Sequence, residues 1–163
     1  MKLIVAVSEN WGIGKDNGLL FSIPTDMKFF RETTKGHTVV MGRKTLESFP
    51  GGKPLKNRLN IVLSTNLPEG EGYTVVRGVD ELLETLKNID GEVFIIGGES
   101  VYKLLLPYAD TALVTKVSAL VPADSFMPNL DEDDCWELEE KSEAVSENGV
   151  EFRFCTYKRV RGE

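Results

Sequence analysis

Short runs of β-prone apolar residues alternate with amphipathic stretches along most of the chain. This pattern predicts strands at 3–7, 38–41, 60–63, 73–76, 93–96 and 112–117. It predicts helices at 25–34, 79–86 and 100–106, and a further helix start just after residue 42. Because several strands are apolar throughout, we expect them to be buried on both faces, as in a parallel sheet.

The C-terminal part departs from this alternation. Residues 136–142 and 150–159 are typical of two strands, and Asn148-Gly149 favours a tight turn that joins them as an antiparallel hairpin. The fold class predicted for 1–163 is therefore a single α/β domain. We expect a mostly parallel mixed sheet of eight strands, with flanking helices and the C-terminal hairpin.

A glycine-rich segment at 9–18 separates the first strand from the first helix. Its glycines and asparagines predict a mobile loop. The spacing of Gly12, Gly14 and Gly18, with no helix directly after them, excludes a Rossmann dinucleotide fingerprint.

Charge and cysteine content narrow the classes of function. A net charge of −7 argues against non-specific binding to nucleic acid or to anionic membranes. Cys135 and Cys155 form no Cys-x-x-Cys pair, and His37 is the single histidine, so we expect no metal site. The apolar N-terminal run is too short for a signal peptide or a membrane span, which favours a reducing cytoplasm.

The first predicted helix carries a carboxylate on its apolar side. Asp26 shares that side with Met27, Phe30 and Thr33, and it lies one turn from Phe30. A carboxylate in such a place must be paired, capped or used to bind a ligand. Helix capping is the simplest alternative, because Asp in a first turn meets free N–H groups and the positive end of the helix dipole.

Three predicted strands end in turns that suit a phosphate. The turns are Gly42 to Thr45, Ser64-Thr65 and Gly97 to Ser100. A solvated basic turn, or glycines that only allow tight packing, would explain each turn taken alone. Because ligands bind such sheets at the carboxyl ends of strands, we expect one shared edge, with Asp26 and Arg58 lining the same cleft. The pattern predicts one phosphate-bearing ligand and a second ligand bound by an acid and an arginine.

Five segments, taken together, resemble the dihydrofolate reductase family. In chain order they are Gly12-Ile-Gly-Lys-Asp-Asn-Gly18, Ile23-Pro-Thr-Asp-Met27, Met41-Gly-Arg-Lys-Thr45, Lys53-Pro-Leu-x-x-Arg58-x-Asn60-Ile61 and Ile96-Gly-Gly-x-x-Val-Tyr102. The resemblance covers essentially the whole chain. It implies reduction of 7,8-dihydrofolate to 5,6,7,8-tetrahydrofolate by NADPH, with hydride added at C6 and a proton at N5, to supply one-carbon metabolism.

The resemblance also implies which residues bind the substrate. Asp26 matches the acid that bonds the pterin, Thr115 the hydroxyl that supports it, and Arg58 the residue that binds the α-carboxylate of the substrate's glutamate. The other matched positions are Ile4, Val5 and Ile96, through their backbone, and Phe21, Met27, Phe30, Phe49 and Leu55, through apolar side chains. Phe21 stands where the family usually has a tryptophan, so it lacks the N–H that would hold a water near the pterin.

For NADPH, the matched positions form three sets. They are Ala6, Ile13, Gly14, Gly18 and Leu19 at the nicotinamide and its covering loop; Gly42, Arg43, Lys44, Thr45, Gly97, Gly98, Glu99, Ser100, Val101 and Tyr102 at the pyrophosphate turns; and Arg43, Ser64, Thr65 and Arg77 around the 2′-phosphate. Leu63 and Ile96 are further positions expected to bind the cofactor. Asp124 matches a loop residue that bonds the mobile loop in relatives. Glu99 replaces a third glycine found in some relatives, and we expect its carboxylate to point to solvent.

Two rival functions remain compatible with the sequence. One is a pyrimidine reductase of riboflavin synthesis, which shares this fold but would need neither Arg58 nor the Ile-Pro-x-Asp segment that contains Asp26. The other is a nucleotide-binding module that performs no chemistry. In every case we expect a small-molecule ligand and a monomer.

Overall fold

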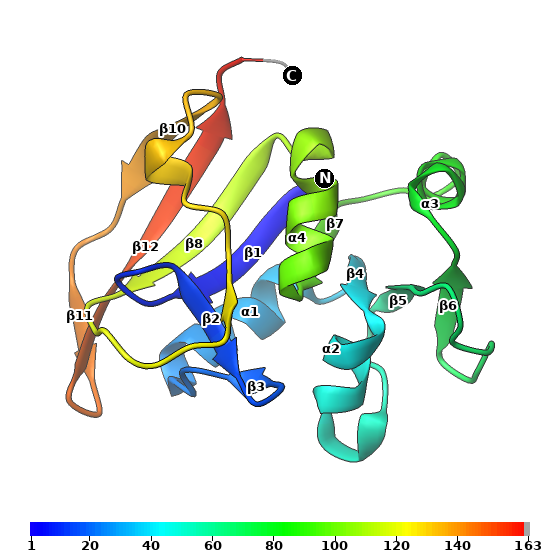
Figure 1. Ribbon diagram of the computed structural model, residues 1–163, viewed down its shortest axis with the longest axis horizontal. Helices are drawn as coiled ribbons and strands as arrows, with labels where there is room; N and C mark the ends of the chain where they lie inside the picture. Colours follow the sequence, from blue (N-terminus) through cyan, green and yellow to red (C-terminus); the bar gives the residue numbers. More distant parts are fainter. Residues whose placement is uncertain (162–163) are drawn as a thin grey trace.

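The computed structural model describes residues 1–161, and a mixed β-sheet runs through its centre (Figure 1). Eight strands follow one another across this sheet in the order β10-β12-β8-β1-β7-β4-β5-β6. Their bounds are β1 Lys2–Val7, β4 Thr38–Gly42, β5 Leu59–Leu63, β6 Tyr73–Val76, β7 Val93–Gly97, β8 Thr111–Val117, β10 Trp136–Lys141 and β12 Val150–Arg159. Strands β1 and β4 to β8 pair in parallel, whereas β12 pairs antiparallel with β8 and with β10. The predicted fold class is confirmed.

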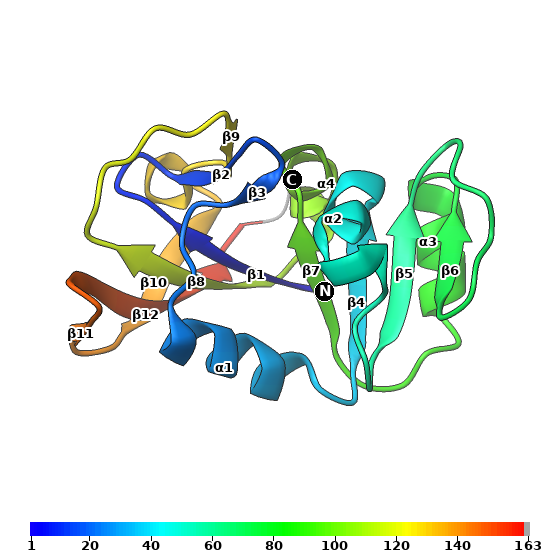
Figure 2. The ribbon, with the colours of Figure 1, turned by 90° about the horizontal axis from the view of Figure 1, so that it is seen from below.

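Four α-helices cover the two faces of the sheet (Figure 2). They are α1 Pro24–Thr34, α2 Arg43–Ser48, α3 Val79–Leu86 and α4 Glu99–Leu105, with short 3-10 helices at Pro50–Gly52, Leu106–Tyr108 and Leu130–Glu132. Pro24 occupies the first turn of α1, where its missing N–H costs nothing. Gly36, with φ of +79°, follows the last residues of that helix and allows the chain to turn away.

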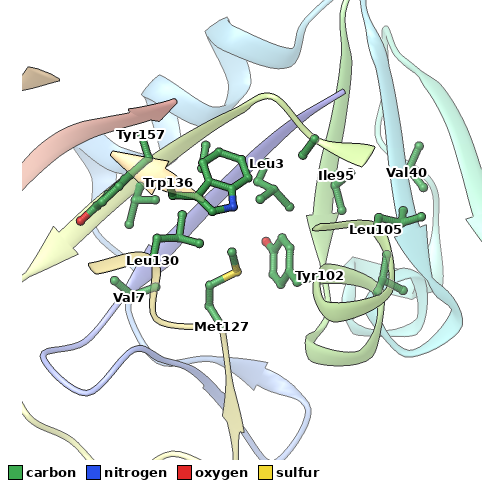
Figure 3. Close-up of a cluster of buried hydrophobic side chains, with 14 of the residues drawn as sticks. Leu3, Val7, Val40, Ile95, Tyr102, Leu105, Met127, Leu130, Trp136 and Tyr157 are labelled. Carbon is green, nitrogen blue, oxygen red and sulfur yellow. The ribbon is translucent and has the colours of Figure 1, made fainter. Parts of the chain in front are cut away.

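Alternate residues of the central strands face opposite sides of the sheet, as the two-residue period of a strand requires. Leu3, Val40 and Ile95 pack in one cluster with side chains of α3 and α4. Figure 3 shows this cluster, where Tyr102 and Leu105 of α4 meet Leu3 and Ile95 of the sheet. The residues next to them in sequence, such as Ile4, Val39 and Phe94, pack in a second cluster with side chains of α1 and α2.

The C-terminal hairpin differs from its prediction. The turn at Asn148-Gly149 is present, but it joins β12 to a separate short strand, β11 (Val145–Glu147). Strand β10 pairs with the second half of β12, through a register shift between Leu138 and Glu140. Because β12 has ten residues, it has room for both shorter strands in succession.

The glycine-rich segment is also more regular than predicted. Strands β2 (Gly12–Lys15) and β3 (Gly18–Leu19) form a small antiparallel sheet with β9 (Ser125–Phe126), in the order β3-β2-β9. Glycine has a low intrinsic preference for strands, so β2 depends on its pairing with β9, far along the chain, and β3 depends on its pairing with β2. The prediction of a loop here was wrong for these residues.

Two kinds of feature are absent from residues 1–161. Among the described helices, none has the length and apolar character needed to cross a membrane. Within the same residues, no three His, Cys, Asp or Glu side chains gather where they could hold a metal ion.

Candidate active site

The carboxyl ends of three neighbouring parallel strands lie together at one edge of the sheet. Gly42 at the end of β4 is paired with Leu63 at the end of β5, and Met41 is paired with Gly97 at the end of β7. The turns that follow these strands are therefore adjacent. This confirms the expectation that the three phosphate-friendly turns share one edge.

Asp26 lies in the first turn of α1 and is partly buried. Its Oδ1 accepts a hydrogen bond of 2.6 Å from Oγ1 of Thr115, a buried residue of β8. Burial raises the pKa of the Asp26 carboxyl, and the bond from Thr115 lowers it in part. Within residues 1–161 this is the only side-chain hydrogen bond that Asp26 makes, so its second oxygen remains available to a ligand.

An apolar cluster lies on the α1 face of the sheet, and it includes Phe30, which follows Asp26 by one turn of α1. The cluster there contains Ile4 together with the partly buried Phe30, Phe49, Leu55 and Ile96. The side chains of Phe30, Phe49 and Leu55 were predicted to form the apolar wall around the substrate, whereas Ile4 and Ile96 were predicted to contact it through their backbone. Met27 differs from its neighbours, because 42% of its surface is exposed and its sulfur accepts a bond of 3.4 Å from the Ser22 hydroxyl.

Arg58 is held on the same side of the sheet by two hydrogen bonds. Its Nε donates to Oγ1 of Thr34 at 2.8 Å, and an Nη donates to the backbone oxygen of Lys56 at 2.9 Å. The guanidinium also lies 5.9 Å from the ring centre of Phe30. Thr34 is fully buried. The sequence did not indicate that it binds Arg58, because a threonine in the last turn of a helix belongs to no recognisable sequence motif. These contacts orient Arg58 beside the apolar wall.

Four polar side chains gather after β5. Arg43 donates to Oδ1 of Asn66 at 2.9 Å, and the hydroxyl of Ser64 lies 3.2 Å from the same oxygen. Arg77 donates to the backbone oxygen of Ser64 at 3.0 Å. The structure thus brings together Arg43, Ser64 and Arg77, as expected, and adds Asn66, which the sequence did not indicate. Arg43 also pairs with Glu47 at 2.9 Å.

The glycine turn after β7 approaches α2 closely. A Cβ on Gly97 would lie 3.4 Å from Oγ1 of Thr45, and one on Gly98 would lie 3.6 Å from it. Gly97 has a φ of +135°, a conformation that side chains rarely adopt. A Cβ on Gly42 would meet Val101 at 3.0 Å. The glycines therefore allow the two turns to approach each other closely.

Tyr102 connects this turn to the centre of the sheet. Its hydroxyl is buried and donates to the backbone oxygen of Ile4 at 2.8 Å. Complete burial raises the pKa of the Tyr102 hydroxyl well above its usual value, so it stays a neutral donor. The bond places Ile4 of β1 beside the start of α4.

Asp124, the residue before β9, is bonded to β2 and to the turn between β2 and β3. The Asp124 carboxylate accepts from the backbone N–H of Asp16 at 2.9 Å, and its own N–H donates to the oxygen of Gly14 at 2.9 Å. This agrees with the expected bond to the covering loop. Leu19, at the outer strand β3, is 81% exposed.

We expected the Glu99 carboxylate to point to solvent, and this expectation was wrong. Its Oε1 accepts from the backbone N–H of Phe126 at 2.6 Å, and its Oε2 pairs with Lys103 at 3.1 Å. The bond to Phe126, followed by the one to Lys103, lowers the pKa of the Glu99 carboxyl. Glu99 therefore joins the start of α4 to strand β9.

The other predicted site residues differ in how far they are exposed to solvent. Val101 is buried; Val5, Ala6, Ile13 and Leu63 are partly buried; Gly14 is buried; and Gly18, Lys44, Thr65 and Ser100 are exposed. Phe21 packs against a third cluster, formed by Ile23, Val117 and Phe152, rather than against Phe30 and Phe49.

Comparisons with known proteins agree with this arrangement. The family model for dihydrofolate reductase matches residues 1–159. The chain is 37% identical to the dihydrofolate reductase of Bacillus subtilis (strain 168) over 163 residues, which cover 98% of this chain and 94% of that protein. It is 40% identical to that of Schistosoma mansoni over 176 residues, which cover 96% and 95%.

A solved structure shows the same fold. Dihydrofolate reductase from Enterococcus faecalis, complexed with NADP(H) and RAB-propyl, gives a TM-score of 0.89 at 34% identity, over 98% of this chain and 96% of that one. Sequence and fold agree over nearly the full length of both proteins. The chain therefore belongs to the dihydrofolate reductase family.

Proposed function

We propose that this protein catalyses the NADPH-dependent reduction of 7,8-dihydrofolate to 5,6,7,8-tetrahydrofolate. The observation that carries the proposal is the partly buried Asp26, which is bonded by Thr115 and lies one helical turn from Phe30 of the apolar wall. The family relationship and the polar groups at the neighbouring strand ends support the same reaction.

Asp26 and Arg58 bind the two polar ends of the substrate. A carboxylate accepts two parallel bonds, so Asp26 can bond a ring nitrogen and the adjacent 2-amino group of the pterin. The apolar wall contacts the aminobenzoyl group between them. Arg58, already oriented by Thr34, takes the α-carboxylate of the glutamate through a charge-assisted bond worth about 1.5–3 kcal/mol.

The reaction also needs a proton at N5 of the pterin. Because burial raises the pKa of Asp26, its carboxyl holds a proton at higher pH than an exposed aspartate would. Its contact with the pterin polarises the ring and raises the proton affinity of the ring nitrogen. Asp26 is therefore the residue that sets the pH dependence of turnover.

The residues at the strand ends fit NADPH. When it is bound, NADPH supplies the hydride. Arg43, Arg77 and the Ser64 hydroxyl offer donors to a 2′-phosphate, and the glycine turn of Gly97 and Gly98 leads into the start of α4, whose free backbone N–H groups would suit a pyrophosphate. Glu47 and Asn66 already engage Arg43, so the guanidinium exchanges these partners for the phosphate.

We further propose that residues 1–163 act as a single monomeric domain in the cytoplasm. The unpaired thiols of Cys135 and Cys155 support a reducing compartment. The net charge of −7 supports small-molecule ligands rather than nucleic acid.

The test is an assay of NADPH absorbance with dihydrofolate present, with the product identified by mass spectrometry. We expect NADPH to be consumed and tetrahydrofolate to form in equal amounts. Binding of NADPH without turnover would indicate a nucleotide-binding module. Turnover of a ribosylaminopyrimidine, with none of dihydrofolate, would indicate a pyrimidine reductase.

A further inference from the structure

A side chain of the C-terminal hairpin bonds to the first turn of α1, the helix that carries Asp26. Glu147 ends β11, and its carboxylate accepts two hydrogen bonds from Thr25, one from the backbone N–H at 2.9 Å and one from the hydroxyl at 2.8 Å. Thr25 directly precedes Asp26 in the chain, whereas Glu147 lies 122 positions further along. The contact therefore attaches the start of α1 to a part of the fold that is remote in sequence (Figure 2).

The start of α1 has no capping side chain of its own. The N-cap residue is Ile23, whose apolar side chain makes no capping bond. Pro24 has no N–H group, so Thr25 carries the first free N–H of the helix. Glu147 supplies the missing acceptor from outside the helix, with a charge that favours the positive end of the helix dipole. The capping of α1 thus does not depend on Asp26.

The hairpin that carries Glu147 is also held in register with Thr115. Strand β11 pairs with the first residues of β12, and Phe154, further along β12, is paired with Thr115 of β8. Thr115 in turn bonds Asp26. The first turn of α1 is therefore attached to the sheet twice, to β8 through Asp26 and to β11 through Thr25, and β12 connects the two points of attachment.

Apolar packing at the same junction does not replace this contact. Ile23 is 5% exposed and packs with Val117 of β8 and Phe152 of β12. Apolar contacts hold the chain close to the hairpin, but they have no fixed direction. Hydrogen bonds do, so both donors of Thr25 must face the carboxylate of Glu147. Glu147 therefore constrains the orientation of the first turn of α1.

We propose that Glu147 is a positioning residue for the reduction of dihydrofolate, which holds Thr25 and thereby keeps the neighbouring Asp26 carboxylate in place against Thr115 and the pterin. The inference rests on the proposed function, because that function assigns the pterin to Asp26. Glu147 acts through the helix and makes no contact with the pterin in this account.

The experiment separates the length of the Glu147 side chain from its charge. Glu147→Gln keeps the length, and its amide can accept from the N–H of Thr25 and donate to the hydroxyl. Glu147→Asp keeps the charge but is one CH₂ group shorter, and Glu147→Ala loses both. For each variant, kcat/KM and Kd for dihydrofolate, Kd for NADPH and Tm are measured, with kinetics and binding well below Tm.

We expect the alanine and aspartate variants to lower kcat/KM about fivefold to tenfold and to weaken dihydrofolate binding about fivefold. Glu147→Gln should stay within about twofold of the wild type, and so should NADPH binding in every variant. Thr25→Val removes one of the two bonds, so it should show part of the loss, and it serves if Glu147→Ala does not fold.

Two controls separate positioning from stability. Glu143→Ala removes the same charge from an exposed site four residues earlier, and it should behave like the wild type. In Thr115→Val, where Asp26 has lost its partner on β8, adding Glu147→Ala should hardly lower kcat/KM further, whereas the losses in Tm should add.

An unchanged kcat/KM in folded Glu147→Ala, with a lower Tm, would overturn the proposal, because Glu147 would then only stabilise the hairpin. Wild-type behaviour of Glu147→Asp together with a loss in Glu147→Gln would also overturn it, since charge rather than position would matter. If the wild-type protein binds dihydrofolate without reducing it, the proposed function fails. The ratios of Kd among the variants would then still decide the role of Glu147.

Discussion

Thr115 Oγ1 donates a hydrogen bond of 2.6 Å to Asp26 Oδ1 and so joins the middle of β8 to the first turn of α1. A hydroxyl has one proton to donate, and here it serves the carboxylate. The bond stabilises the ionised form of an acid whose pKa is raised by burial. Thr115 therefore orients Asp26 and limits how far its pKa rises.

Replacing Thr115 by valine tests this pairing. Thr115→Val keeps the branched shape but removes the donor, so the pKa of Asp26 should rise further. Because the reaction consumes a proton, we expect the fall of kcat/KM with increasing pH to move to higher pH. The maximum of kcat/KM should nevertheless be about tenfold lower, because Asp26 loses the hydrogen bond that orients it. Thr115→Ser should behave like the wild type, and an unshifted pH profile in Thr115→Val would show that the bond does not tune the acid.

Neutralising Asp26 should stabilise the free protein. Burial raises its pKa in the folded state above the value of 3.8 in the unfolded chain. Between these two values the folded protein binds more protons, so stability falls as pH rises through that window and stays low above it. Asp26→Asn should raise Tm at pH 7 by about 2–4 °C, and the gain should shrink as pH falls toward 3.8. Asp80→Asn, at an exposed first-turn position of α3, is the control and should give no gain; an equal gain there would contradict the account.

Arg43 should distinguish the two nicotinamide cofactors. It lies with Ser64 and Arg77 where a 2′-phosphate is expected, and a charge-assisted bond contributes about 1.5–3 kcal/mol. Arg43→Ala should therefore weaken NADPH binding by about tenfold or more and NADH binding by less than about twofold. Dissociation constants for both cofactors check this. Glu47→Gln, which frees Arg43 from its exposed ion pair, should slightly tighten NADPH. Equal losses for both cofactors in Arg43→Ala would mean that Arg43 does not contact the 2′-phosphate.

Glu99 should hold strand β9 against the start of α4. Its bond to the backbone N–H of Phe126 is short and charge-assisted, so Glu99→Ala should expose that amide. We expect hydrogen exchange at Phe126 to become about tenfold faster. Lys103→Gln breaks only the exposed ion pair with Glu99, and such pairs contribute little. The prediction fails if exchange at Phe126 is the same in Glu99→Ala and the wild type.

The sequence predicted the parts of the fold that depend on local pattern. Apolar runs placed the strands of the parallel sheet within a residue or so, and Pro24 marked the start of α1. Strands β2 and β3 were missed because glycines carry no strand preference and because β9, the second partner of β2, lies more than 100 residues away. The final turn at Asn148-Gly149 was recognised, but not the strand that it joins to β12.

The sequence likewise indicated some residues of the candidate site and missed others. Asp26, Arg58 and Arg43 stood out through residue type and family resemblance. Thr34 and Asn66 did not, because short polar residues at helix ends and in turns are common, and only the folded structure shows what they bond. Likewise, the partner of Glu99 is a backbone N–H of a distant strand, which no sequence pattern indicates.

The central claim is that Asp26 acts on the pterin of dihydrofolate. Steady-state turnover of Asp26→Asn at pH 7, with NADPH saturating and folding verified by Tm, tests it most directly. The account predicts that NADPH binding is retained and that turnover falls about a hundredfold or more, as when a group that assists proton transfer is removed. Near-normal turnover by the folded variant would contradict it.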